Sequence, residues 1–359
     1  MFYYTYMLKS ISNGVKKTYV GYTNNLNLRL NKHNSNKGAK STKGYKWILI
    51  YSKKFKTKNE ATASAQNVGI ATSNPGSLFH NIGTAVANAA NANGLNTTIQ
   101  PATSPNQFIP FVNDGGIEFG VANLQEVNYS ITGEAWWNGK KNENIRVVGH
   151  LQPLVEAIFV RKDSDIMKVG DLRGKAMTDG YTAQNTILPQ LSAFYATAGM
   201  TRDDVEQVSV ASVVAGANAF MAGDTVGFIF AHGAGKVREA DAAVGGLRAL
   251  GVDDSSDAAL AAARAHWPTA FFKKLKAGAM PGVLEDDTYI AFPQVVFTHA
   301  GASDEAVYQM AKAMYEQGKV MGETFPPMRA FKPADMRGDI GISEFHPGAI
   351  RFYEEVGLK

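Results

Sequence analysis

The amino-acid sequence changes abruptly in charge and composition near residue 60, and this change constrains the fold more than any other feature. Residues 1–60 contain 13 Lys or Arg residues and one acidic residue, Glu60, for a net charge of +12. Residues 61–359 contain 23 basic and 31 acidic residues, for a net charge of −8. Such asymmetry predicts two modules with different partners, and the basic module suits a polyanion such as nucleic acid.

The composition also excludes several classes of site. The chain has 359 residues, enough for two or three domains, and it contains no cysteine. Disulfides, thiolate zinc sites and cysteine nucleophiles are therefore excluded. No stretch approaches the roughly 18 apolar residues that a membrane-spanning helix needs. The histidines lack metal-ligand spacing, and Gly233–Lys236 lacks two residues of a phosphate-binding loop, so we expect neither a metal nor a cofactor.

The first module is predicted to be a small α/β domain over residues 1–61. Aromatic and β-branched runs predict strands over 2–8, 17–22 and 47–51, with an Asn-Gly turn at 11–14 and a helix over 24–34. Thr5–Met7 and Tyr19–Gly21 occupy the positions of two paired motifs. The stretch Tyr19–Leu26 leads to Arg29 and His33, and a basic loop follows at Lys37–Gly44. These motifs, in this order, resemble the GIY-YIG nuclease domain.

The resemblance implies that Tyr6, Tyr19, Arg29 and His33 occupy the positions that surround the scissile phosphate in that family. A phenol can pass a proton to or from the attacking water, and a guanidinium can stabilise charge on the phosphoryl oxygens. The family also needs a metal-binding glutamate, which would fall near Ala65. No carboxylate lies between Glu60, a turn too early, and Asp114. We therefore expect a truncated, inactive nuclease module that binds DNA weakly through basic residues of 1–58. A small basic domain without nuclease ancestry is the alternative.

The second module, residues 67–359, alternates between strand-like and helix-like segments. Strands are predicted at 67–71, 97–100, 119–122, 146–149, 157–161, 175–178, 206–210 and 226–230, and a long β-stretch at 289–299. Helices are predicted at 78–93, 185–199, 216–221, 304–325 and 347–357. This alternation indicates two α/β lobes with largely parallel sheets. The predicted boundaries are a junction at 62–66, lobe 1 at 67–156, lobe 2 at 157–287, and a return to lobe 1 at 288–359.

Four stretches of the second module resemble the TAXI family, the extracytoplasmic solute receptors of tripartite TRAP transporters. They are Val160–Ser164 continuing through Gly170–Lys175, then Ala198–Val205, Met280–Val283 and Phe345–Tyr353. The resemblance implies a type II periplasmic-binding-protein, or venus-flytrap, fold. It also implies that the module closes by hinge motion on a small organic solute, an amino acid or carboxylate, without catalysis. The TRAP membrane permease subunits would be its partners.

Ligand-binding candidates lie in the loops that follow strands, where helix N-termini also offer backbone N–H groups. From lobe 1 they are Thr72, Ser73, Asn74, Ser77, Phe79, Thr103, Ser104, Asn106, Asn123 and Gln125, and from lobe 2 they are Asp179, Tyr181, Thr182, Gln184, Asn185 and His232. The alternative is a structural role, in which the Thr, Ser and Asn residues only cap helices. Asp179 departs from the family pattern. Its carboxylate would disfavour a nearby anion, or it could meet an amine.

The sequence leaves alternatives open for the cellular location and for the function of the whole chain. The resemblance places the receptor in the periplasm, and Ala63–Gln66 resembles a signal-peptidase site, but no hydrophobic signal segment precedes it. Taken as written, the chain would stay cytoplasmic. The sequence leaves open a gene fusion, an assembly artefact and a natural recombinant. The alternative function is a structure-specific DNA endonuclease with an appended binding domain.

Overall fold

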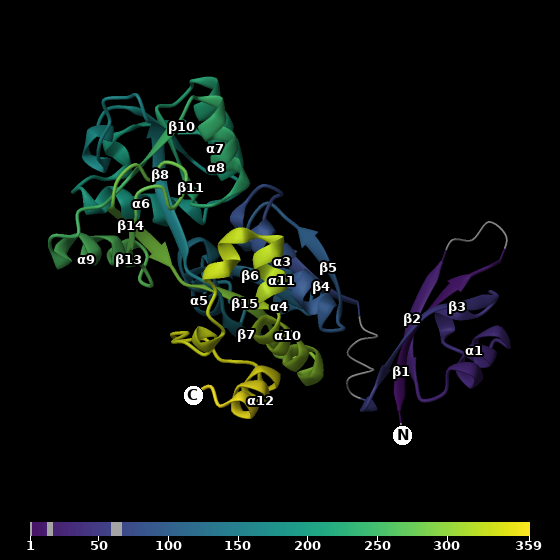
Figure 1. The fold of residues 1–359 in the computed structure, drawn as a ribbon. Coiled ribbons are helices and arrows are strands. Elements are labelled where there is room, and N and C mark those ends of the chain that lie inside the picture. The colour runs from purple at the N-terminus through teal and green to yellow at the C-terminus, as the bar shows by residue number, and fades with distance from the viewer. Residues whose placement is uncertain (1, 13–16, 59–66) are drawn as a thin grey trace.

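The computed structural model describes residues 2–12, 17–58 and 67–359 of the chain. The N-terminal part is a three-stranded antiparallel sheet in the order β2-β1-β3, with one α-helix packed on β3 (Figure 1). Its elements are β1 (Tyr3–Ser10), β2 (Thr18–Thr23), α1 (Leu26–Asn34), η1 (Lys40–Thr42) and β3 (Trp47–Phe55). Tyr6, Leu8 and Trp47 form its small core. The predicted Asn-Gly turn, Glu60 and the predicted junction at 62–66 include residues outside those described.

The first lobe of the larger module is built on a five-stranded sheet in the order β5-β4-β6-β15-β7. The strands are β4 (Asn67–Thr72), β5 (Asn96–Pro101), β6 (Phe119–Asn123), β7 (Ile145–His150) and β15 (Gln294–His299). Its helices are α3 (Leu78–Ala92), α4 (Pro105–Asn113), α5 (Leu124–Thr132), η2 (Ala135–Trp137), α10 (Asp304–Glu316), α11 (Gly318–Thr324), η5 (Pro326–Ala330), η6 (Pro333–Asp335) and α12 (Pro347–Val356). The buried helix α3 packs on β4 and β5 and is covered by α10 and α11.

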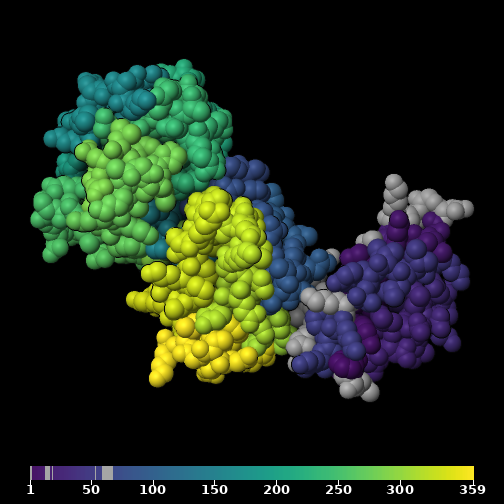
Figure 2. Space-filling model, viewed as in Figure 1, coloured from purple at the N-terminus to yellow at the C-terminus, as the bar shows by residue number. Residues whose placement is uncertain are grey.

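The second lobe is built on a seven-stranded sheet in the order β10-β9-β11-β8-β14-β13, with β12 paired to β8. The strands are β8 (Leu154–Arg161), β9 (Ala176–Asp179), β10 (Glu206–Ser209), β11 (Gly227–Ala231), β12 (Leu247–Leu250), β13 (Phe271–Leu275) and β14 (Asp287–Phe292). The helices are η3 (Val169–Leu172), α6 (Ile187–Thr197), η4 (Arg202–Asp204), α7 (Val213–Ala222), α8 (Gly235–Ala243) and α9 (Asp257–His266). In Figure 2 the two lobes of the larger module lie side by side and touch.

The predicted β-stretch over 289–299 was wrong in one respect, because it is two strands in different sheets. β14 pairs with β8 in lobe 2, whereas β15 pairs with β6 and β7 in lobe 1. Pro293, which has no N–H to give to a ladder, lies between them. The chain therefore returns to lobe 1 at Pro293 rather than at the predicted residue 288, and it first leaves lobe 1 between β7 and β8.

Two further expectations need correction. The predicted helix over 304–325 is two helices, α10 and α11, separated at Gln317. The sheets are mixed rather than largely parallel, because β8, β14 and β15 pair antiparallel with their neighbours. None of the helices formed by the described residues is long and apolar enough to cross a membrane.

Candidate functional site

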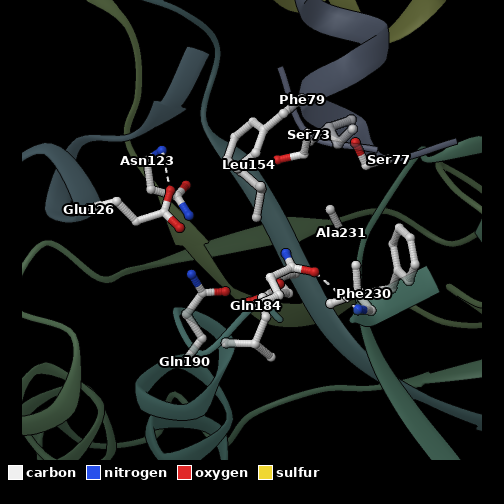
Figure 3. Close-up of a pocket in the computed structure, with 14 residues that line it drawn as sticks. Ser73, Ser77, Phe79, Asn123, Glu126, Leu154, Gln184, Gln190, Phe230 and Ala231 are labelled. Atoms are coloured by element: carbon white, nitrogen blue, oxygen red, sulfur yellow. Dashed lines mark hydrogen bonds between the residues drawn. The ribbon is translucent and has the colours of Figure 1, made fainter. Parts of the chain in front are cut away.

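A cavity lies where the two lobes meet, with a volume of about 30 Å³ (Figure 3). Lobe 1 contributes the β4–α3 loop and the β6–α5 junction, and lobe 2 contributes the β9–α6 loop, the start of α7 and the end of β11. The lining residues are Ser73, Ser77, Leu78, Phe79, Asn123, Glu126, Leu154, Glu156, Gln184, Ile187, Gln190, Val213, Phe230 and Ala231. In this conformation the cavity has room for only one or two water molecules, so we expect a solute to enter when the lobes are further apart.

Two carboxyl groups are buried in the wall of this cavity. Glu126, in the first turn of α5, is 1% exposed, and Glu156, on β8, is 3% exposed. The backbone N–H of Asn123 donates to Glu126 Oε2 at 2.9 Å. With its amide oriented to satisfy its neighbours, Gln190 donates Nε2–H to both oxygens of Glu156, at 3.2 and 3.0 Å. Each carboxyl group therefore has a neutral donor, and no Lys, Arg or His residue is among those that line the cavity.

Burial strongly affects the protonation of both groups. Removal from water raises the pKa of Glu126 to about 7, against the smaller opposing effect of its hydrogen bond from Asn123. Burial, followed by the charge of Glu126, raises the pKa of Glu156 to about 8. Desolvation penalises the charged form of an acid, and a neighbouring negative charge adds to the penalty. Burial therefore favours the neutral form of both carboxyl groups up to about neutral pH.

Hydrogen bonds join the two lobes beside the cavity. In the orientation of Gln190 given above, its Oε1 accepts from Asn123 Nδ2 at 3.2 Å. Ser104 Oγ, in lobe 1, donates to the carbonyl oxygen of Ala183, in lobe 2, at 3.1 Å. Both bonds must break if the lobes separate, because each has one partner on either side.

One hydroxyl group on the cavity wall is unused. Ser73 is 2% exposed, and its Oγ has no hydrogen-bond partner among the described residues. A buried hydroxyl without a partner is costly, and such groups are few in folded proteins. Ser77 differs, because its Oγ accepts from the N–H of His80 at 3.2 Å and caps α3. Ser73 Oγ is thus available to a bound molecule.

The structure brings together part of the predicted ligand set. Ser73, Ser77, Phe79, Asn123 and Gln184 line the cavity. Their contact with a ligand stays a prediction. The other candidates are not among the lining residues; they are Thr72, Asn74, Thr103, Ser104, Asn106, Gln125, Asp179, Tyr181, Thr182, Asn185 and His232.

Several of these other candidates have structural partners instead. The Tyr181 hydroxyl is 2.7 Å from Thr178 Oγ1. The His232 ring packs against the rings of Phe159 and Tyr289, each with a centroid separation of 5.0 Å. Burial lowers the pKa of His232 to about 3, so this side chain is neutral. Both side chains belong to the packing of lobe 2 rather than to the cavity.

Asp179, which we expected to disfavour a nearby anion or to meet an amine, does not line the cavity and is paired within lobe 2. Its carboxylate accepts from Arg202 Nε at 2.9 Å, and a second guanidinium nitrogen of Arg202 bonds its other oxygen. Asp179 is 1% exposed, so its charge is neutralised inside lobe 2. This pair could not be anticipated, because 23 positions separate its members.

Three polar residues of the site, Glu126, Glu156 and Gln190, were missed. The sequence carried a signal for Glu156, since it is the one acidic residue in the otherwise apolar run from Leu154 to Val160. A charged side chain in a buried strand needs a reason, and function is a common one. Glu126 follows Asn123 at capping-box spacing, a pattern that predicts only a helix start.

The four predicted nuclease positions do lie together in the N-terminal domain. Tyr6 Oη accepts from Arg29 Nε at 2.9 Å and is 2.8 Å from His33 Nε2. The ring of Tyr19 lies against that of His33, with centroids 4.8 Å apart. Burial raises the pKa of Tyr6 to about 12 and lowers that of His33 to about 4.

A surface pocket of about 720 Å³ adjoins this group and includes Tyr19, Arg29, Lys32 and Lys58. Its cations and aromatic rings suit a nucleic-acid backbone and bases. No group of three His, Cys, Asp or Glu side chains that could hold a metal ion occurs within residues 2–12, 17–58 and 67–359. Glu60, the candidate metal ligand from the sequence, lies outside those ranges.

Two family profiles match adjoining parts of the chain. That of the NMT1-like family matches residues 70–357, and that of the GIY-YIG catalytic domain matches residues 2–68. Over 59 residues the chain is 46% identical to uncharacterized protein L300 of Acanthamoeba polyphaga mimivirus, covering 15% of this chain and 34% of that protein. Over 60 residues it is 40% identical to UPF0213 protein SH2523 of Staphylococcus haemolyticus, covering 16% of this chain and 70% of that protein. The chain thus spans about a third of the mimivirus protein.

The larger module superposes on solved structures of periplasmic proteins. A structure described as a periplasmic transporter superposes with a TM-score of 0.51 at 11% identity, covering 81% of this chain and 92% of that one. The alkanesulfonate-binding protein SsuA of Xanthomonas axonopodis pv. citri gives a TM-score of 0.44 at 15% identity, covering 80% and 83%. The family profiles and the first superposition confirm the predicted fold class, a two-lobed periplasmic-binding-protein fold preceded by a small GIY-YIG domain.

Proposed function

Because this chain belongs to the NMT1-like family through residues 70–357, we propose that its larger module is the solute-binding receptor of a membrane transporter. The observation that carries the proposal is the cavity between the lobes, which takes polar side chains from both. A solute held there would contact lobe 1 through Ser73 and Asn123 and lobe 2 through Gln184. Such a solute would favour the closed arrangement of the lobes by its contacts to both.

The finer form of the proposal is a TAXI-type receptor of a TRAP transporter that works in the periplasm. Four stretches of sequence, ending with Phe345–Tyr353, support this assignment. The TRAP membrane permease subunits would then be the partners of the closed, solute-loaded module. The lining residues fit binding better than catalysis, because they include no nucleophile paired with a base.

The test is thermal unfolding of the full chain against solutes of several charge classes: amino acids, dicarboxylates, oxo-acids, sulfonates and amines. A ligand at 100 times its dissociation constant should stabilise the native state by about 2.7 kcal/mol. For the solute that binds, Ser73→Ala should weaken affinity about two- to tenfold, because one hydrogen bond is lost. The empty variant should keep its stability, since Ser73 Oγ has no partner there.

Ser303→Ala is the matched control for that variant, because Ser303 caps α10 and is not among the residues that line the cavity. It should lower the free energy of unfolding by about 1 kcal/mol and leave the affinity unchanged. Absence of stabilisation by every class of solute would overturn the receptor proposal.

A second candidate function rests on the N-terminal domain. The GIY-YIG profile and the contacts among Tyr6, Arg29 and His33 favour recognition of a DNA phosphate backbone. We propose binding without cleavage, because the sequence offers no carboxylate at the position expected for the metal ligand.

A further inference from the structure

The walls of the interlobe cavity carry an unusual balance of charge. Both titratable side chains that line it, Glu126 and Glu156, are acids, and the remaining lining residues are neutral. The other buried acid of the same region, Asp179, has its own cation in Arg202 and does not line the cavity. The cavity is therefore the place where buried carboxyl groups lack a positive partner.

We propose that the cavity takes a solute with net positive charge, a protonated amine or amidine, whose cationic group lies between the carboxyl groups of Glu126 and Glu156. This inference rests on the proposed receptor function and names the class of solute. Buried carboxylates are strongly unfavourable unless they are paired with a cation, and the donors that Glu126 and Glu156 have are neutral. A cation would compensate both carboxylates at once.

A second observation points independently to a ligand at the same place. Ser73 Oγ is buried, has no partner and lines the same cavity from the lobe 1 side. Figure 3 shows Ser73, Glu126 and Gln190 around one common space. An ammonium group carries three donors, so it can satisfy two carboxylates and a hydroxyl together.

The apolar residues that line the cavity indicate the chemistry of the rest of the solute. Phe79, Leu154, Ile187 and Phe230 give the cavity apolar faces on both lobes. These faces suit a short aliphatic or aromatic carbon skeleton, whereas a second anionic group would face Glu126 and Glu156 without a cation. Burial raises the pKa of both glutamates, and the charge of Glu126 adds to the rise for Glu156, so a bound cation would oppose both shifts.

Two further titratable side chains near the cavity, Tyr181 and His232, are neutral. Tyr181 lies near Glu156, and its pKa is raised by burial, so it is neutral. His232 is neutral for the reason given above. Neither can supply the positive charge that a bound cation would bring.

The experiment compares solutes of matched length with different charge on the full chain. We would measure affinity by calorimetry and thermal unfolding for putrescine, agmatine, 4-aminobutyrate, 1,4-butanediol, succinate and butanesulfonate. The expected order is the two cations first, the zwitterion next, and no binding of the anions. Glu156→Gln should weaken putrescine or agmatine binding by at least ~30-fold, since a buried charge pair is broken. Glu126→Gln is the second variant should the first fail to fold.

Glu239→Gln is the matched control, because Glu239 is an exposed acid on α8 paired with Lys236. It should leave affinity unchanged. Stabilisation by succinate or butanesulfonate, with no effect of the amines, would overturn the cationic-solute inference while the receptor function stands. No stabilisation by any of the six compounds or by the wider set of solutes would overturn both.

Discussion

At the scale of single residues, the larger module treats its buried acids in two ways. Asp179 is held by the guanidinium of Arg202, so its charge is compensated inside the protein. Glu126 and Glu156 receive only neutral donors, and they sit at the wall of the interlobe cavity. The first arrangement compensates the charge within lobe 2, and the second is the basis of the cationic-solute proposal. Removing the cation that pairs with Asp179 should therefore lower the stability of the fold, whereas Glu126 and Glu156 have no such cation to lose.

The Asp179–Arg202 pair gives a prediction about stability. Arg202→Ala would leave the Asp179 carboxylate buried without its cation, so the free energy of unfolding should fall by about 3–5 kcal/mol. The control is Arg161→Ala, which breaks an exposed pair with Asp163 and should leave the stability nearly unchanged, because solvent screens that pair. Urea denaturation measures both. Equal losses in the two variants would contradict the structural role assigned to Asp179.

At the scale of elements, the close packing of α3 on β4 positions the first loop of the cavity. Ser73 follows β4 directly and Ser77 caps α3, so their positions depend on how closely the two elements approach. Gly83 lies on the buried face of α3, and a Cβ there would be 2.2 Å from Thr72 Cγ2. Thr72 is buried and β-branched, so its methyl group cannot move aside easily.

Gly83→Ala should therefore lower the free energy of unfolding by about 1–3 kcal/mol through overpacking, although alanine is the better helix former. The matched control is Gly318→Ala at the start of α11, where no atom lies within 4 Å of the new Cβ. That variant should be neutral or slightly stabilising. A stabilised Gly83→Ala protein, by thermal or urea unfolding, would mean that α3 and β4 are not so closely packed.

At the scale of the whole molecule, the chain joins two modules with opposite charge. The GIY-YIG domain carries its basic residues without a nearby acid in residues 1–59, whereas the larger module is acidic. The two candidate sites are also chemically opposite, since one contains Arg29 bonded to the Tyr6 phenol and the other has two carboxyl groups on its wall. Polyanions and small cations are thus expected to bind separate parts of one chain.

We predict that the full chain binds duplex or branched DNA at low salt, and that the affinity falls steeply as salt rises because counterions are released. Added Mg²⁺ or Mn²⁺ should give no nicking. Lys32→Ala, in the surface pocket of the N-terminal domain, should weaken binding. Lys319→Ala, an exposed lysine of α11, should not. Gel-shift and nicking assays test these points, and metal-dependent cleavage would support the nuclease as the working part of the chain.

The amino-acid sequence by itself determined the two-module division, the α/β class and most strand and helix positions. Charge, composition and hydrophobic periodicity are local properties, so they can be determined from the sequence without the tertiary structure. The resemblance to the GIY-YIG domain also grouped Tyr6, Tyr19, Arg29 and His33, which the structure places together.

Only the tertiary structure decided which polar residues share the cavity. Glu126 and Glu156 are 30 positions apart, on an α-helix and a strand, and no periodicity relates them. The same holds for Asp179 and Arg202, and for the passage of the chain between lobes at Pro293. Sequence patterns report the environment of each residue along its own element, whereas the charge balance of a cavity depends on which elements pack together. That choice follows from burial of apolar surface over the whole module, which no short stretch encodes.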